Sequence, residues 1–110
     1  DDPAFDALCL ATDADLDRHH AVAIGQVLAD LGDADDGVLR YKGCLALSNK
    51  DHHVVFQGVR TYSREARFDA KRRWTTNESR LVFVGKHLNR SKLVAAFEPY
   101  NFAPVVPVVN

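Results

Sequence analysis

The sequence predicts an α+β fold: a two-layer sandwich with a four-stranded, mostly antiparallel sheet and two helices on one face, in the order β-α-β-β-β-α. Three observations carry this prediction. Two β-like runs flank a polar, turn-forming middle within residues 38–60, another apolar run covers residues 79–88, and apolar residues recur at helical spacing over residues 16–31. With 110 residues, 46% hydrophobic and 26% charged, the chain fits one globular domain.

The first part of the chain predicts a strand followed by a helix. Residues 1–4 are expected to be the end of a linker, and residues 5–12 alternate apolar side chains as a strand does. The acidic run that starts at Asp13 supplies an N-cap, and Gly32 is placed to end the helix. Because Gly25 costs about 1 kcal/mol against Ala inside a helix, we expect it at a close packing contact.

A hairpin follows, and its strands are expected to form the centre of the sheet. Its first strand places two sets of side chains on opposite faces: Leu39, Tyr41, Gly43, Leu45 and Leu47 on one, and Arg40, Lys42 and Cys44 on the other. The returning strand, residues 54–62, and the later strand, residues 79–88, carry apolar residues on both faces. Such strands usually lie where both faces of a sheet are covered. Since the two helices are expected on one face, a partner domain is expected to cover part of the other.

The remaining segments are predicted as a loop, a helix and a tail. Residues 63–78 form a long basic segment that we expect to be a loop. Asn89 is a good N-cap for the second helix, with a hydrophobic staple around it. Residues 101–110 contain two prolines and no periodicity, which predicts an extended or disordered tail and leaves residues 5–100 as the domain.

Charge and cysteine usage exclude several classes of protein. The formal net charge is −1, which gives no overall field to attract nucleic acid or anionic lipid. Cys9 and Cys44 lie in apolar runs without a Cys-x-x-Cys spacing, so we expect buried free thiols. No apolar run approaches the ~18 residues of a membrane span, and we expect a cytoplasmic location, with an organelle as the alternative. Because residue 1 is Asp and not Met, we expect a fragment of a longer protein.

Several stretches of the sequence, taken in order, resemble a known family. They are VLRYKG at residues 38–43, VVFQGV at residues 54–59, Trp74, and SRLVFVGKHL at residues 79–88 with the helix that follows. Together they resemble the C-terminal domain of the CobW-type GTPases, a group that includes cobalamin-biosynthesis CobW, nitrile hydratase activators and zinc-regulated metallochaperones. The resemblance covers about residues 5–100.

The resemblance implies a non-catalytic interaction and regulatory domain attached to a P-loop GTPase. The expected partners are that GTPase domain and a metal-requiring client protein, in cobalamin biosynthesis or zinc homeostasis, with no membrane partner. GTP, Mg²⁺ and zinc or cobalt are expected to belong to the parent protein, and neither catalysis nor a bound cofactor is expected of this domain. In agreement, the sequence contains neither a glycine-rich Walker loop nor a cysteine-rich metal motif.

Two groups of side chains outside the basic loop are candidates for a site. The weak metal candidates are His19, His20, His52 and His53. Neighbouring helical residues point about 100° apart, so such a pair is poor at chelating one ion, and surface histidines are the alternative interpretation. Arg40, Lys42 and Gln57 are interpreted either as a docking face for the nucleotide domain or as ordinary exposed polar positions.

The basic loop supplies the last candidates: Arg67, Lys71, Arg72, Arg73 and Trp74. These side chains could contact an acidic surface of a client or GTPase domain, remain solvated, or bind single-stranded nucleic acid by stacking and phosphate contacts. The alternative function is therefore a small nucleic-acid-binding module, against which the net charge argues. A small enzyme is a third interpretation, although no nucleophile lies beside an identifiable base.

Overall fold

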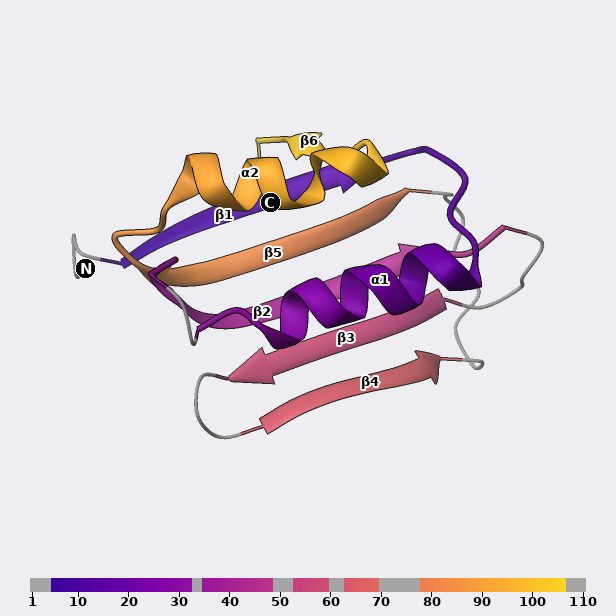
Figure 1. Ribbon diagram of the computed structural model, residues 1–110, viewed down its shortest axis with the longest axis horizontal. Helices are drawn as coiled ribbons and strands as arrows, with labels where there is room; N and C mark the ends of the chain where they lie inside the picture. The colour runs from indigo at the N-terminus through magenta and orange to yellow at the C-terminus, as the bar shows by residue number, and fades with distance from the viewer. Residues whose placement is uncertain (1–4, 33–34, 49–52, 60–62, 70–77, 107–110) are drawn as a thin grey trace.

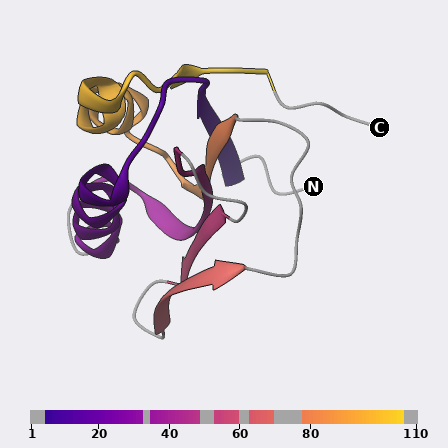
Figure 2. The same cartoon turned by 90° about the vertical axis from the view of Figure 1, so that its right-hand side faces the viewer.

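The computed structural model describes residues 5–32, 35–48, 53–59, 63–69 and 78–106, with side chains for all of these except residues 63–69. The elements are β1 (Phe5–Thr12), α1 (Arg18–Ala29), β2 (Val38–Ala46), β3 (His53–Val59), β4 (Ser63–Asp69), β5 (Ser79–Lys86), α2 (Arg90–Phe97), a short 3₁₀ turn η1 (Glu98–Tyr100) and β6 (Ala103–Pro104). The strands form one antiparallel sheet in the order β4-β3-β2-β5-β1-β6. Both helices lie on the same side of it (Figures 1 and 2).

The α+β class, the two helices and the antiparallel sheet are confirmed, but the predicted number of strands is wrong. The sheet has five long strands and a two-residue sixth, β6. The additional long strand is β4, which lies in the segment predicted as a basic loop and pairs with β3 over its whole length. Charged side chains are common in edge strands, so β4 lacks the apolar alternation on which the prediction depended.

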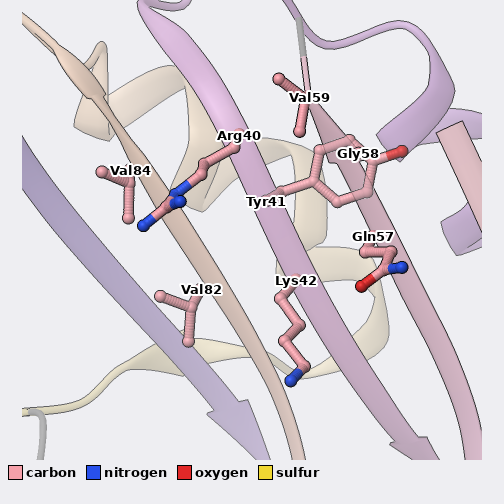
Figure 3. A pocket seen from close by; sticks show the side chains of 8 residues that line it. All are labelled: Arg40, Tyr41, Lys42, Gln57, Gly58, Val59, Val82 and Val84. Carbon is pink, nitrogen blue, oxygen red and sulfur yellow. The ribbon is translucent and has the colours of Figure 1, made fainter. Parts of the chain in front are cut away.

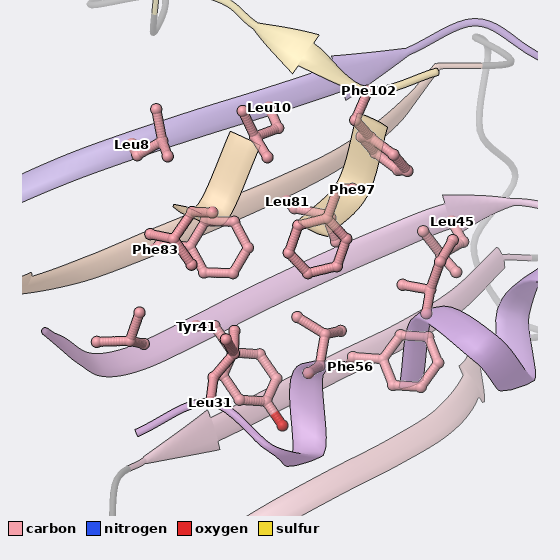
Figure 4. Close-up of a cluster of buried hydrophobic side chains, with 14 of the residues drawn as sticks. Leu8, Leu10, Leu31, Tyr41, Leu45, Phe56, Leu81, Phe83, Phe97 and Phe102 are labelled. Carbon is pink, nitrogen blue, oxygen red and sulfur yellow. The ribbon is translucent and has the colours of Figure 1, made fainter. Parts of the chain in front are cut away.

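The hydrophobic core fills the space between the sheet and the helices (Figure 4). Alternation along β5 turns Leu81 and Phe83 toward the helices, where both are fully buried. Ile24 of α1 and Leu93 of α2 reach the same layer and are also fully buried. Phe97 of α2 stacks on Phe83 with ring centroids 5.5 Å apart. The helices are therefore held by an apolar layer that belongs to one face of the sheet.

Helix α1 is shorter than the predicted segment, residues 16–31. Leu16 lies before the helix and forms an isolated bridge with Leu47, and Asp17 is the N-cap. Gly25 makes the close contact expected of it, because a Cβ at this position would lie 2.8 Å from a ring carbon of Phe56. The missing side chain allows α1 to approach β3.

The segment around α2 and η1 stays in contact with the domain. The side chain of Asn89 accepts a hydrogen bond from the Lys92 N–H at 3.2 Å, which confirms the predicted N-cap. Beyond η1, Phe102 is buried against Phe97 with ring centroids 6.3 Å apart, and β6 pairs with β1. Residues 107–110 of the predicted tail lie outside the described residues. Within the described part of the chain, no helix is long and apolar enough to cross a membrane.

A buried carboxylate holds the connection between α1 and β2. Asp36 has 0% of its surface exposed, and its side chain accepts hydrogen bonds from the N–H groups of Gly32 at 3.1 Å and Val38 at 2.8 Å. Its carbonyl oxygen accepts the N–H of Asn89 at 2.9 Å. In the fold, Asp36 joins the end of α1, the start of β2 and the start of α2.

Candidate docking groove on the open sheet face

The sheet has a second face, turned away from the helices, which we call the open face (Figure 2). Strand alternation and the pairing registers place these residues on it: Phe5, Ala7, Cys9 and Ala11 of β1, Arg40, Lys42, Cys44 and Ala46 of β2, His53, Val55, Gln57 and Val59 of β3, and Arg80, Val82, Val84 and Lys86 of β5. One end, around Ala46 and His53, is buried. The other end, around Arg40 and Val59, is exposed.

A groove of about 470 Å³ crosses the exposed end of the open face. Its lining residues are Arg40, Tyr41, Lys42, Gln57, Gly58, Val59, Val82 and Val84 (Figure 3). They come from the three neighbouring strands β3, β2 and β5. The structure thus brings together the three sheet residues that the sequence indicated, Arg40, Lys42 and Gln57, and adds valines between them.

Each cation of the groove lies between side chains of the two flanking strands. Arg40 is paired with Val59 of β3 and Val84 of β5, and Lys42 is paired with Gln57 and Val82. Side chains directly opposite one another on adjacent strands have Cβ atoms about 4.5–5.5 Å apart. Val59 is 44% exposed and Val82 is 37% exposed. The surface therefore combines accessible positive charge with accessible aliphatic carbon.

A β-bulge in β2 turns Arg40 into the groove. Between Val38 and Arg40 the register with β5 shifts, so that Val38 pairs with Gly85 and Arg40 with the adjacent Val84. In a regular strand, residues 38 and 40 would share a face. Because Leu39 is the additional residue, Val38 is buried in the core while Arg40 is exposed on the open face. The predicted core position of Leu39 is therefore wrong, and Val38 occupies it.

Positive charge dominates the described open face. Arg80 is paired with Glu78, and this hydrogen bond is the main cause that raises the pKa of the Arg80 guanidinium above its usual value. The ammonium group of Lys86 lies 4.9 Å from the centre of the Phe5 ring, within the range of a cation–π contact. In the part of the chain with described side chains, no ion pair to a carboxylate involves Arg40 or Lys42.

Comparison with known families identifies the fold. A family model described as "Cobalamin synthesis protein cobW C-terminal domain" matches residues 5–100. The chain belongs to this family. The resemblance seen in the sequence is confirmed, and it covers the predicted residues. No curated protein matches the chain significantly.

Two crystal structures resemble this cobW C-terminal domain. They are Zn(II)-bound YjiA GTPase from E. coli and a Zn(II)-bound triple mutant of YjiA GTPase. Each is 26% identical, and the TM-scores are 0.66 and 0.67. The match covers 87% of this chain and 29% of each YjiA chain. The chain thus corresponds to less than a third of the GTPase that it resembles.

The three histidine candidates that the structure describes, His19, His20 and His53, form no common site. His19 is exposed on α1. His20 is part of the helix cap, because its Nδ1 accepts the Asp17 N–H at 3.0 Å. His53 is buried at the far end of the open face, and His52 lies outside the described residues. Among the described residues, no three His, Cys, Asp or Glu side chains are grouped to hold a metal ion.

The thiols of the domain lie on either side of β5. Cys9 pairs with Val82, and Cys44 pairs with Arg80, so the two cysteines are two strands apart on the open face. Two strand spacings amount to about 9–10 Å, beyond the ~7 Å limit on Cα separation for a disulfide. Neither cysteine forms a disulfide, as predicted. Cys9 is buried as expected, but Cys44 is only partly buried, so its predicted burial is wrong.

The structure describes only the first part of the basic segment. Arg67 lies in β4, opposite Val55 of β3. Lys71, Arg72, Arg73 and Trp74 lie outside the described residues. Their contact with a client protein, a GTPase domain or a nucleic acid stays a prediction.

The sequence did not identify the valines of the groove as part of a site. It showed apolar residues on both faces of β3 and β5, including Val59, Val82 and Val84. That pattern was the available signal. The lateral order of the strands was needed to show that these valines surround Arg40 and Lys42.

Proposed function

We propose that this domain is the non-catalytic interaction and regulatory module of a CobW-like GTPase, and that its open face contacts the GTPase domain. The observation that carries the proposal is the pair of exposed cations, Arg40 and Lys42, between the exposed valines Val59 and Val82. Domain interfaces within one chain commonly bury 600–1,500 Å² and are more polar than obligate interfaces. A mixed cationic and aliphatic sheet face has the composition that such a contact needs.

Nucleotide and metal chemistry are assigned to the other domain in this proposal. The sequence has no Walker loop to surround phosphates, and the described residues group no set of metal ligands. These residues therefore do not fit GTP or a tightly bound zinc ion. The likeness to Zn(II)-bound YjiA GTPase supports a parent protein that uses GTP and zinc. Cobalt is the other metal in the proposal, and it rests on the family resemblance alone.

The proposed mechanism is a change of domain arrangement. The GTPase domain presents one surface with GTP bound and another with GDP bound, and the open face binds one of them more tightly. A ligand shifts such an equilibrium only by its difference in affinity for the two states. The arrangement then controls when a metal ion passes to a client protein.

Isothermal titration calorimetry of the 110-residue chain against the GTPase domain tests this proposal. We expect saturable binding whose affinity differs between the GDP form and the form with a GTP analogue. Arg40→Glu should weaken binding by about tenfold or more, because it places like charges together at the contact. Lys92→Glu makes the same charge change on exposed α2 and should have little effect. Equal affinities of the two variants would refute the assignment of the open face.

A further inference from the structure

The open-face positions of β1, β2, β3 and β5 carry no carboxylate, while the register of β4 places Glu65 opposite Gln57 and Asp69 opposite His53. The whole chain has 15 Asp and Glu and 14 Lys and Arg. In the four strands with described side chains, the open-face positions include Arg40, Lys42, Arg80 and Lys86, and neither Asp nor Glu. Positive charge is therefore in excess on β2 and β5, and the carboxylates that pair with open-face positions belong to β4. Such a field favours a partner of opposite sign over a neutral one.

Two of these four cations, Arg40 and Lys42, lie in the groove, and the other two have described partners elsewhere on the sheet. Glu78 neutralises Arg80 at one end of β5, and Lys86 lies over the Phe5 ring at the other. Arg40 and Lys42 are two positions apart on β2, so their Cβ atoms are separated by about 7 Å along the strand. Both are exposed. A complementary ligand has two carboxylates at a similar separation.

Aliphatic surface separates and surrounds the two cations. Val82 and Val84 lie on one side and Val59 on the other (Figure 3). The ring of Tyr41 belongs to the core cluster and packs over Gly58, where a Cβ would lie 2.5 Å from it. The described groove thus presents no aromatic face on which a nucleic-acid base could stack, the contact on which single-strand binding commonly depends.

We propose that the groove binds an acidic, aliphatic segment of the GTPase domain, which presents two carboxylates and a branched apolar side chain on the same face. The carboxylates pair with Arg40 and Lys42, and the apolar side chain packs on the valines of β5, Val82 and Val84. The identity of the partner rests on the function proposed above. The chemistry of the segment follows from the groove itself, by charge complementarity and by the exposed valines.

The direct probe is a labelled peptide in which two glutamates and a valine occupy every second position, so that they share one face of an extended chain. A matched peptide with glutamine in place of glutamate and a single-stranded oligouridylate are its companions. Fluorescence anisotropy at low ionic strength measures affinity, and NMR locates the contact by the amide signals of β2, β3 and β5. We expect saturable binding of the acidic peptide, at least about tenfold tighter than that of the glutamine peptide. The acidic peptide should also displace the GTPase domain.

Variants of the chain separate the two components of recognition. Arg40→Glu should weaken peptide binding by about tenfold, and Val82→Ser by about threefold through lost apolar contact. The matched controls are Lys92→Glu and Val22→Ser, both at exposed positions on the helical side. They should change affinity by less than about twofold.

Each remaining outcome overturns the proposal. Absence of saturable binding, equal affinity for the glutamine peptide, or shifted signals outside the groove would exclude the acidic segment. Oligouridylate that binds as tightly as the peptide, without loss in Val82→Ser, would show a surface for nucleic acid. If the GTPase domain binds through Arg40 while the peptide does not, this inference fails and the proposed function stands. If the peptide binds in the groove but the GTPase domain does not, the proposed function fails and the partner assignment falls with it.

Discussion

Replacing Asp36 by alanine removes the acceptor for two buried N–H groups. The side chain of Asp36 accepts from Gly32 at 3.1 Å and from Val38 at 2.8 Å, in a site with 0% exposure. A buried donor left without a partner costs about 1–3 kcal/mol, so the two donors together predict a loss of about 2–6 kcal/mol. This is a large share of the ~5–15 kcal/mol that stabilises a domain.

Asparagine at the same position provides a graded comparison. Its amide oxygen can still accept from Val38, but its NH₂ group faces the N–H of Gly32 and cannot accept from it. We expect Asp36→Asn to cost about half as much as Asp36→Ala, about 1–3 kcal/mol. For a domain of this size, 1 kcal/mol lowers the melting temperature by about 4 °C, which gives shifts of about 4–12 °C for Asn and about 8–24 °C for Ala.

Urea unfolding followed by circular dichroism measures these losses, and the slope against urea should stay constant if compactness is unchanged. The control is Asp35→Ala, since Asp35 is the neighbouring carboxylate and is exposed. A surface substitution of this kind usually changes stability by less than about 0.5 kcal/mol. If Asp36→Ala were no more destabilising than Asp35→Ala, the inference that this carboxylate holds the loop would be refuted.

Three further predictions concern the helices. Gly25→Val should destabilise by about 1–3 kcal/mol in urea unfolding, because its Cβ would lie 2.8 Å from the Phe56 ring. Asn89→Ala should cost about 0.5–2 kcal/mol in the same assay, since the N-cap of α2 is lost. The pKa of Asp17 is lowered from 3.8, chiefly by the hydrogen bond from the His20 N–H. The contribution of Asp17 to the free energy of unfolding should therefore be complete above about pH 4 and be lost as the pH falls through the lower folded-state pKa. The difference in melting temperature between the native chain and Asp17→Ala should shrink over the same range.

Exposed neighbours serve as controls for these three changes. Gln26→Val adds a β-branched residue at an exposed position of α1. Lys92→Ala shortens an exposed side chain in the first turn of α2 and keeps the backbone N–H that Asn89 accepts. Asp13→Ala removes an exposed carboxylate outside the helix cap. A Gly25 or Asn89 variant as stable as its control would contradict the contact or the cap. A melting-temperature difference for Asp17→Ala that grew, instead of shrinking, as the pH was lowered through 3.8 would contradict the assigned direction of the pKa shift.

Local sequence patterns were sufficient for most of the fold. Strand β1 has the predicted bounds, residues 5–12, and Asn89 caps α2 as expected. Gly25 makes the predicted close contact. These features depend on neighbours in the chain or on one exceptional residue, so alternation, helical spacing and cap chemistry are enough to predict them.

Features that depend on distant segments were not predicted. Strand β4 is stabilised by pairing with β3 and carries no apolar alternation of its own. The role of Asp36 was not predicted, because it depends in part on Asn89, whose backbone N–H reaches the Asp36 carbonyl only in the folded chain. The bulge at Leu39 is a property of the β2–β5 register.

The sequence by itself determined the family and the fold class, and it identified Arg40, Lys42 and Gln57 as candidate site residues. Short ordered motifs and strand alternation are enough for each of these predictions. The tertiary structure decided that these residues form a groove. Val82 and Val84 come from β5, about forty residues further along the chain, and reach Arg40 and Lys42 because β5 pairs with β2. Pairing between strands distant in sequence depends on the packing of the whole sheet, so local patterns do not contain this arrangement.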